Sequence, residues 1–154
     1  MAVNTGKTNA RWIQVIVDDA TADVTPQDIS PSVTSVTIPI NYATADVTGY
    51  SDGVTNITIG QPSVNVTMDG VFSNTALLGA HTVLTQIVGQ DSGENAAAPY
   101  APYTVLIKVG IRAAWVATNP QFTGQFVCSE YTVNGDLTWH ASFHPASSVL
   151  PGWV

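Results

Sequence analysis

Residues 46–89 read DVTGYSDGVTNITIGQPSVNVTMDGVFSNTALLGAHTVLTQIVG, and they place three patterns in a fixed order. A polar passage marked by glycines comes first. Val64, Val66 and Met68 then alternate with polar residues, which predicts a strand with one buried face. A helical pattern follows this strand directly. No group in the stretch is arranged for catalysis, so we expect it to build a surface.

The helix is predicted over about residues 75–88. Ser73 and Asn74 are suitable residues for capping its start, and Gly89 is placed to end it. Gly79 falls inside this span, where a glycine weakens a helix. The apolar residues that fall near helical spacing are Leu77, Leu78, Val83, Leu84, Ile87 and Val88.

Strand patterns dominate the rest of the chain, with β-branched and aromatic residues in short runs. Asn134, Gly135 and Asp136 form a turn signal between two of these runs. Strand and helix patterns do not alternate regularly, so we predict a mainly β (α+β) fold. It would be an antiparallel β-sandwich or barrel of two packed sheets with one flanking α-helix. The runs are residues 11–17, 33–40, 63–72, 103–116, 122–133 and 137–143.

A chain of 154 residues is expected to form a single domain, residues 1–154. Residues 1–10 are small and polar and are expected to be a flexible N-terminal arm. Residues 41–60 are expected to form an extended loop or arm, because they are polar and contain several glycines. Residues 145–154 are expected to be a C-terminal tail.

The chain carries few charged residues. They make up 10% of it, against about 25% in an average globular protein, while hydrophobic residues make up 45%. A surface so poor in charge is either covered by other copies of the chain or rich in threonine, serine and asparagine. Composition favours neither explanation over the other.

The net charge is −7, from four basic and eleven acidic residues. Nucleic acids are bound through lysines and arginines that neutralise phosphates, so this chain should repel DNA. Repulsion would suit a channel through which DNA slides, although negative charge also simply keeps a protein soluble. The sequence shows no apolar run of membrane-spanning length and no segment of the signal-peptide type. We therefore expect no membrane partner, and synthesis in a cytoplasm.

The histidines and the single cysteine form no recognisable reaction centre. His140 and His144 are four residues apart on one predicted strand, which is roughly 13 Å and too far to share a metal ion. His81 has no second ligand near it in the sequence. Cys128 is expected to be a small buried residue, and it cannot form an internal disulfide. We expect no catalytic residues, no bound metal and no cofactor, and hence no enzyme.

Aromatic residues leave one binding function open. Tyr100, Tyr103 and Trp115 would line a sugar-binding face if the chain were a β-sandwich carbohydrate-binding module. Their alternation with polar residues fits positions in a core or an interface better.

Five segments occur in the order found in one known family. They are RWIQVIVDDATADVTPQDISPSVTSV, ADVTGYSDG, SVNVTMDGVFSN, GAHTVLTQIVG and FVCSEYTVNGDLTWHASFHPAS. Their order resembles the major tail tube protein of long, non-contractile-tailed (siphovirus-type) bacteriophages. The resemblance covers most of residues 11–145.

The resemblance implies a structural virion protein. Six subunits would form a ring, and rings would stack into a tail tube around a channel through which DNA passes without specific binding. Sheets from the six copies would join into one inner barrel. The partners would be further copies of the chain and other phage tail proteins (tape measure, terminator and tail tip). The protein would be assembled in the cytoplasm of the host bacterium and reside in the virion tail.

The same resemblance suggests two sets of site residues. Residues 42–59 would form an arm that reaches the neighbouring ring, and some of four aspartates would face the channel and repel DNA phosphates. A capsid decoration protein or a head–tail connector protein is the alternative within phages. The expected contact residues are Tyr42, Val47, Tyr50, Val54 and Ile57, and the four aspartates are Asp46, Asp52, Asp69 and Asp136.

Overall fold

The computed structural model describes residues 13–18, 26–74, 79–89, 103–109, 119–146 and 149–154. These residues form mainly strands, with one α-helix, α1 (Ala80–Ile87), and a short 3-10 helix, η2 (Ser30–Ser32). The prediction of a mainly β fold with one flanking helix is confirmed. The strands are β1 (Ile13–Asp18), β2 (Pro26–Asp28), β3 (Val33–Thr37), β4 (Asn41–Asp46), β5 (Ile57–Ser63), β6 (Val66–Val71), β7 (Tyr103–Val109), β8 (Gln121–Val133), β9 (Thr138–Pro145) and β10 (Gly152–Trp153).

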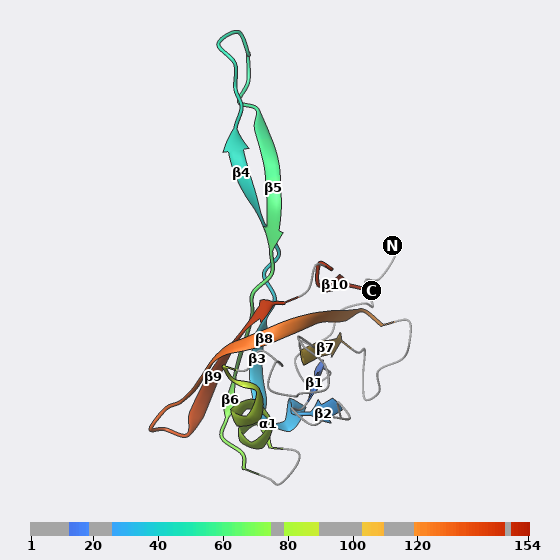
Figure 1. Ribbon diagram of the computed structural model, residues 1–154, viewed down its shortest axis with the longest axis vertical. Coiled ribbons are helices and arrows are strands. Elements are labelled where there is room, and N and C mark those ends of the chain that lie inside the picture. The colour runs from blue at the N-terminus through green and yellow to red at the C-terminus, as the bar shows by residue number, and fades with distance from the viewer. Residues whose placement is uncertain (1–12, 19–25, 75–78, 90–102, 110–118, 147–148) are drawn as a thin grey trace, which may run out of the picture.

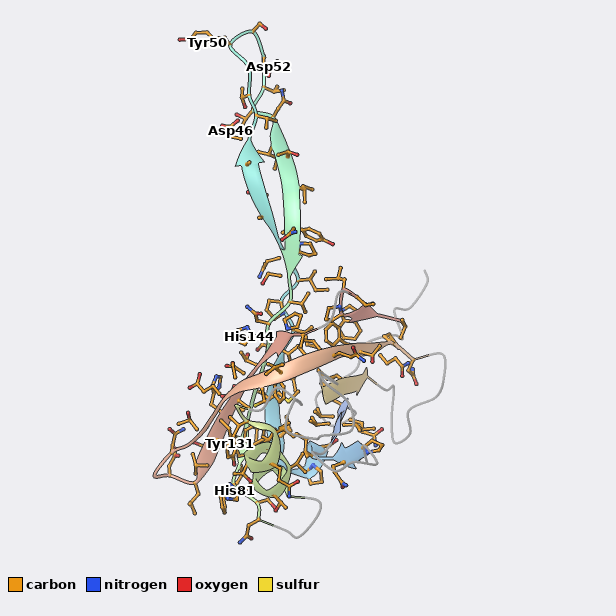
Figure 2. The ribbon with its side chains drawn as sticks, in the orientation of Figure 1. Asp46, Tyr50, Asp52, His81, Tyr131 and His144 are labelled. Atoms are coloured by element: carbon orange, nitrogen blue, oxygen red, sulfur yellow. The ribbon has the colours of Figure 1, made fainter. Side chains whose placement is uncertain are left out.

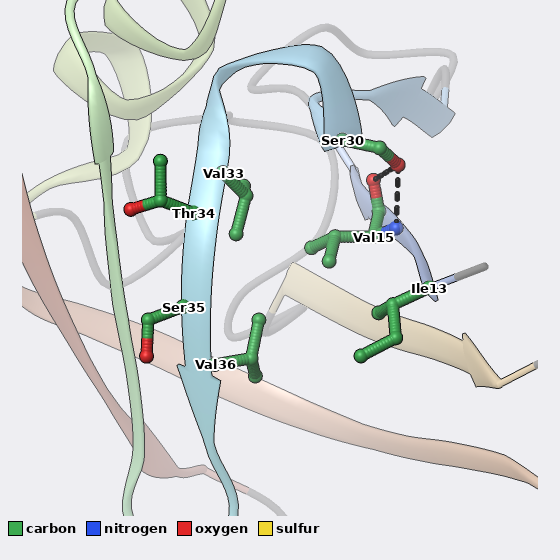
Figure 3. Close-up of a pocket in the computed structure, with 7 residues that line it drawn as sticks. All are labelled: Ile13, Val15, Ser30, Val33, Thr34, Ser35 and Val36. Carbon is green, nitrogen blue, oxygen red and sulfur yellow. Dashed lines mark hydrogen bonds between the residues drawn. The ribbon is translucent and has the colours of Figure 1, made fainter. Parts of the chain in front are cut away.

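Eight of these strands form one antiparallel sheet in the order β2-β1-β7-β8-β9-β6-β3, with β10 paired to β8. The sheet curls, so that β1 and β3 face each other across a hollow of about 230 Å³ (Figure 3). Ile13 and Val15 line it from β1, and Val33 and Val36 line it from β3. The two expected layers are therefore parts of one curled sheet.

The core lies inside this curl. Trp139, Ala141 and Phe143 alternate along β9 and are almost fully buried, and β6 adds Val66 and Met68 to the same core. Helix α1 covers the core from the same side (Figure 1) with Val83, Leu84 and Ile87. Burying a side chain of this size stabilises a fold by about 1.5–3 kcal/mol.

The helix begins later than its sequence pattern suggests. Gly79 has an extended backbone (φ −72°, ψ 138°) and precedes the first helical residue, so it is the N-cap and not an interior glycine. Ser73 and Asn74 do not cap the helix, although the Ser73 carbonyl accepts a hydrogen bond from the His81 N–H at 3.1 Å. The expected residues 75–78 lie outside the described part of the chain.

Two strands leave the body of the molecule. β4 and β5 pair with each other in a separate two-stranded sheet and project away from the curled sheet (Figure 1). Every residue from 41 to 63 is exposed. We call residues 41–63 the arm. Residues 1–10 lie outside the described chain, and none of the described helices is long and apolar enough to cross a membrane.

Candidate functional site: the projecting arm and the polar sheet face

The arm has two unlike faces. Tyr42 pairs with Pro62, Thr44 with Ile59, and Asp46 with Ile57. Directly paired residues of antiparallel strands project on the same side. Tyr42, Ile57 and Ile59 therefore share one face, and the register shift between Tyr42 and Thr44 brings Pro62 to that face as well.

The opposite face of the arm carries small residues. A Cβ placed on Gly60 would lie 3.2 Å from the Cβ of Ala43, so these two residues project together. On the apolar face, Tyr42, Ile57 and Ile59 are 50%, 62% and 66% exposed. A lone two-stranded hairpin is at best marginally stable in water. An apolar face on such a hairpin is therefore a surface suited to contact with another molecule.

Two carboxylates hold the tip of the arm. Asp46 accepts hydrogen bonds from the N–H of Thr48 (2.8 Å) and from its hydroxyl. Asp52 accepts hydrogen bonds from the Gly49 N–H (2.6 Å) and the Asn56 side-chain amide (2.9 Å). These hydrogen bonds lower the pKa of both carboxyl groups below their usual value of 3.8, because they stabilise the charged form.

The ordered tip presents apolar side chains to solvent. Val47 and Val54 are 56% and 72% exposed, and Tyr50 is exposed completely at the end of the hairpin (Figure 2). The five expected contact residues thus all lie exposed on the arm, two on its apolar face and three at its tip. Ile59 belongs to the same face and was not among the five expected contact residues, although its alternation with Ile57 is the signal that would have identified it.

A second surface lies on the outer side of the curled sheet. Asp69 on β6 and His140 and Ser142 on β9 alternate with buried neighbours and project away from the core. The His140 Nδ1 lies 2.7 Å from the Asp69 Oδ1, and the Ser142 hydroxyl lies 3.3 Å from the His140 Nε2. Glu130 on β8 pairs with Ser142 and projects on the same side. We call this surface the polar face.

Hydrogen bonds connect Asp69, His140 and Ser142 in the order acid, base and nucleophile, as in a catalytic triad. The surroundings of these three residues differ from those of a triad. The side chains of His140 and Asp69 are 37% and 52% exposed, so water competes for their hydrogen bonds. β9 pairs with β6 on one side and β8 on the other, so its backbone N–H groups are used by the sheet. They are not available to stabilise an oxyanion. The three residues form a surface hydrogen-bond network.

The histidines do not converge on a common centre. His144 hydrogen-bonds Asn65 (3.0 Å), whereas His81 contacts the Tyr131 hydroxyl (3.1 Å) beneath α1. No cluster of three metal-ligating side chains is present in the described parts of the chain. Cys128 is buried as predicted, and burial raises the pKa of its thiol to about 11.

The structure does not bring the four expected aspartates together. Asp69 lies on the polar face, whereas Asp46 and Asp52 lie at the arm tip. Asp136 lies in the turn between β8 and β9, where it accepts a hydrogen bond from the Thr138 N–H (3.1 Å). Bonds to Thr138 lower the pKa of Asp136 below its usual value.

Glu130 is the acidic residue of the polar face that sequence reasoning missed. The register of β8 against β9 shifts between Cys128 and Glu130, so simple alternation along β8 gives the wrong face beyond Cys128. A β-bulge of this kind leaves no clear signal in a single sequence. Tyr100 and Trp115 lie outside the described residues, and the side chain of Tyr103 is likewise not described.

No protein-family model matches the chain, and no curated protein matches it. Solved structures of gene transfer agent particles contain chains that share its fold. A chain from the virion of a native gene transfer agent particle is 15% identical, with a TM-score of 0.56, and the match covers 95% of this chain and 99% of that one. A chain from the tail of an empty gene transfer agent particle, which has C6 symmetry, is 14% identical, with a TM-score of 0.53 and the same coverage. The fold is therefore shared over nearly the full length with these virion and tail chains.

Proposed function

We propose that this chain is the structural subunit of a phage-type tail tube, in which rings of six copies stack around a channel for DNA. One observation carries the proposal: the fold is shared over 95% of the chain with a chain from a tail of C6 symmetry. A tube subunit needs surfaces for its own copies rather than a reaction centre, so the role is structural and not enzymatic. Other tail proteins (tape measure, terminator and tail tip) would meet the tube in the virion after assembly in the bacterial cytoplasm.

Ring closure is supported by two sheet edges. β3 ends the curled sheet and, in the described strands, pairs with β6 alone. β8 pairs with β7 only as far as Phe126, and beyond Cys128 its described strand partner is β9 alone. Unpaired edges are ready templates for another strand. The β3 edge of one copy would meet the outer part of β8 in the next, joining six sheets into one inner barrel.

Stacking is supported by the arm. Twenty-three residues, 41–63, are all exposed and stand clear of the body (Figure 1). A standard protein interface uses about 20–30 residues on each side. The arm is therefore large enough to form one side of a contact with the neighbouring ring. Its contact residues would be Tyr42, Val47, Tyr50, Val54 and Ile57, together with Ile59.

The polar face is suited to line the channel. Strands β3, β6, β8 and β9 contain no lysine or arginine, while Asp69 and Glu130 give this face two carboxylates. Such a surface would repel DNA phosphates and let DNA slide. We assign the channel role to Asp69 and Glu130. We assign a structural role to Asp46, Asp52 and Asp136, because each accepts hydrogen bonds that hold its own loop in place.

Electron microscopy of the purified chain tests the proposal. Negative staining should show rings or tubes, and averaged end views should show sixfold symmetry. A capsid decoration or connector protein would not form long tubes alone, and a carbohydrate-binding module would remain a monomer by light scattering. A chain that stays monomeric at all accessible concentrations would refute self-assembly.

A further inference from the structure

The chain forms an apolar patch where the arm leaves the body. We call this the root patch, and its residues are Val149, Leu150, Trp153 and Val154, which are 73%, 47%, 47% and 72% exposed. They line a hollow of about 460 Å³ together with Thr123, Gly124 and Gln125 of β8. The described residues that line this hollow include no charged side chain.

The root patch is a built surface and not a frayed chain end. β10 pairs with β8, and the backbones of Gln121 and Val154 exchange two hydrogen bonds of 3.0 and 2.9 Å. The rings of Trp153 and Phe122 pack edge to face at 5.6 Å. Pro151 lies so close to Gly124 that a Cβ there would be 2.5 Å away. These contacts fix the position of the patch relative to the sheet.

The root patch continues into the apolar face of the arm. A second hollow, of about 320 Å³, shares Val149 and Leu150 with the first and is also lined by Pro62 of β5. Pro62 pairs with Tyr42 and projects on the apolar face of the arm. One apolar strip therefore runs from the arm down to the C-terminal residues.

The length of the arm determines which part of a second copy its tip can reach. About eleven residues separate Asn41 from the tip, and at about 3.3 Å per residue they span about 35 Å. A second copy in the same orientation, displaced by one arm length, has its root patch at the height of the first copy's tip. The tip and the root patch are different surfaces, so each copy can use its tip on one neighbour and its root patch on another. Such a head-to-tail contact between displaced copies does not form a closed pair, and the stack can continue without limit.

We propose that Val47, Tyr50 and Val54 at the tip of one arm seat on the root patch of a second copy in the adjacent ring. This inference rests on the proposed function and adds the receiving surface. Both surfaces are apolar, and the carboxylates of Asp46 and Asp52 already have donors within the tip. Docking thus buries no unpaired side-chain charge. The arm lies along the second copy and supplies the area that a stable contact needs.

Cysteine cross-linking tests the contact directly. A chain carrying both Tyr50→Cys and Leu150→Cys is assembled and treated with a short bismaleimide. It should give a ladder of covalent multimers, because every copy offers one tip and one root. The native Cys128 is buried and should not react. Each single variant should give dimers at most.

The matched control places the second thiol at the other end of the molecule. Val71 is as exposed as Leu150 (53% against 47%) but lies beside the β8–β9 turn, on the side away from the arm. The pair Tyr50→Cys and Val71→Cys should give no ladder. Tubes that form while the Tyr50–Leu150 pair gives no ladder, or while the Val71 pair gives an equal one, overturn this inference and leave the proposed function intact. Failure of the unmodified chain to assemble overturns both.

A double-mutant cycle provides a second readout. Tyr50→Ala and Leu150→Ala should each raise the critical concentration for assembly about tenfold, since each removes an apolar contact. If the two side chains contact each other, the double variant should also raise the critical concentration only about tenfold, because either substitution alone already removes the contact. If the two substitutions act independently, the critical concentration of the double variant should rise about a hundredfold, and this result would contradict the contact. Circular dichroism confirms that the variants are folded.

Discussion

The indole ring of Trp139 packs directly against Gly70, where a Cβ would lie 2.6 Å from the ring and 1.9 Å from the carbonyl oxygen of Ser32. The indole N–H donates a hydrogen bond to the Val71 carbonyl at 3.0 Å, which fixes the ring over β6. This close packing at Gly70 joins β9, β6 and the residue before β3. This packing lies beneath the polar face, so it also sets the shape of the surface that we assign to the channel.

Gly70→Ala should therefore destabilise the fold by about 3 kcal/mol or more, since the new methyl group meets both a backbone oxygen and an aromatic ring. Urea denaturation of the unassembled subunit measures the change in the free energy of unfolding. Gly135→Ala is the matched control, because nothing lies within 4 Å of its added Cβ. Equal stability of the two variants would show that the close packing at Gly70 is not maintained in solution.

Replacing residues 47–56 with Asn-Gly should leave a folded subunit that cannot polymerise. Asp46 and Ile57 pair directly, so a two-residue turn can join them without disturbing β4 and β5. Sedimentation should show monomers or single rings where the unmodified chain forms tubes. A full-length variant with Val47, Tyr50 and Val54 changed to serine separates loss of apolar contact from loss of length. Normal tubes from the shortened chain would contradict the role of the arm.

The order of the arm tip should depend on pH. Hydrogen bonds lower the pKa of Asp46 and Asp52 in the folded tip, so their contribution is fully present above the usual value of 3.8 and is lost as the pH falls through the lowered values. The amide resonances of Thr48 and Gly49 should shift in that acidic range. In Asp52→Asn the Gly49 shift should disappear while the Thr48 shift remains. A Gly49 shift that persists in this variant would identify another titrating group as its cause.

Changing Asp69 and Glu130 to asparagine and glutamine should slow DNA passage, because the polar face loses its two carboxylates per subunit. Changing both to lysine should slow it further and make tubes retain DNA in a manner that weakens with salt. Dye-based ejection measurements on particles built with each variant would test this. Asp136→Asn, which removes one carboxylate from a turn, serves as the control, and it is compared with Asp69→Asn alone, which removes one carboxylate from the polar face. Equal ejection from all variants would refute the assignment of the polar face to the channel.

Cys128 should resist thiol reagents in the folded chain. Its side chain is fully buried, and burial raises its pKa to about 11, so almost no reactive thiolate exists at neutral pH. Mass spectrometry should detect labelling only after unfolding in denaturant. Rapid labelling of the native chain would show that β8 opens locally near Cys128.

Periodicity identified the parts of this fold that obey simple alternation. Val66 and Met68 on β6 were assigned correctly because this strand has one buried face. The helix start was placed too early, since Gly79 has an extended backbone and stands outside α1. Composition alone does not distinguish a glycine that caps a helix from one within it.

The surfaces were harder to predict than the core. Glu130 was missed because a register shift reverses the side on which the outer part of β8 projects. Asp46 and Asp52 were grouped with Asp69 because a sequence shows charge but not position. The sheet order that separates them depends on pairings between distant segments, such as Asp69 with His140. The root patch could not be predicted because its position depends on Gly124 and Pro62, which lie beside the patch in the structure but far from it in the sequence.

The register shift in the arm sets the three steps from Ile59 to Pro62 on β5 against the two steps from Thr44 to Tyr42 on β4. The extra residue of β5 is a β-bulge, and a bulge bends its strand and increases the local twist. Losing this one residue would restore an even ladder and keep Tyr42 and Ile59 on one side, but it would straighten the base of the arm and change its direction. Functional relatives should therefore keep a bulge at this place even where the residues that form it differ.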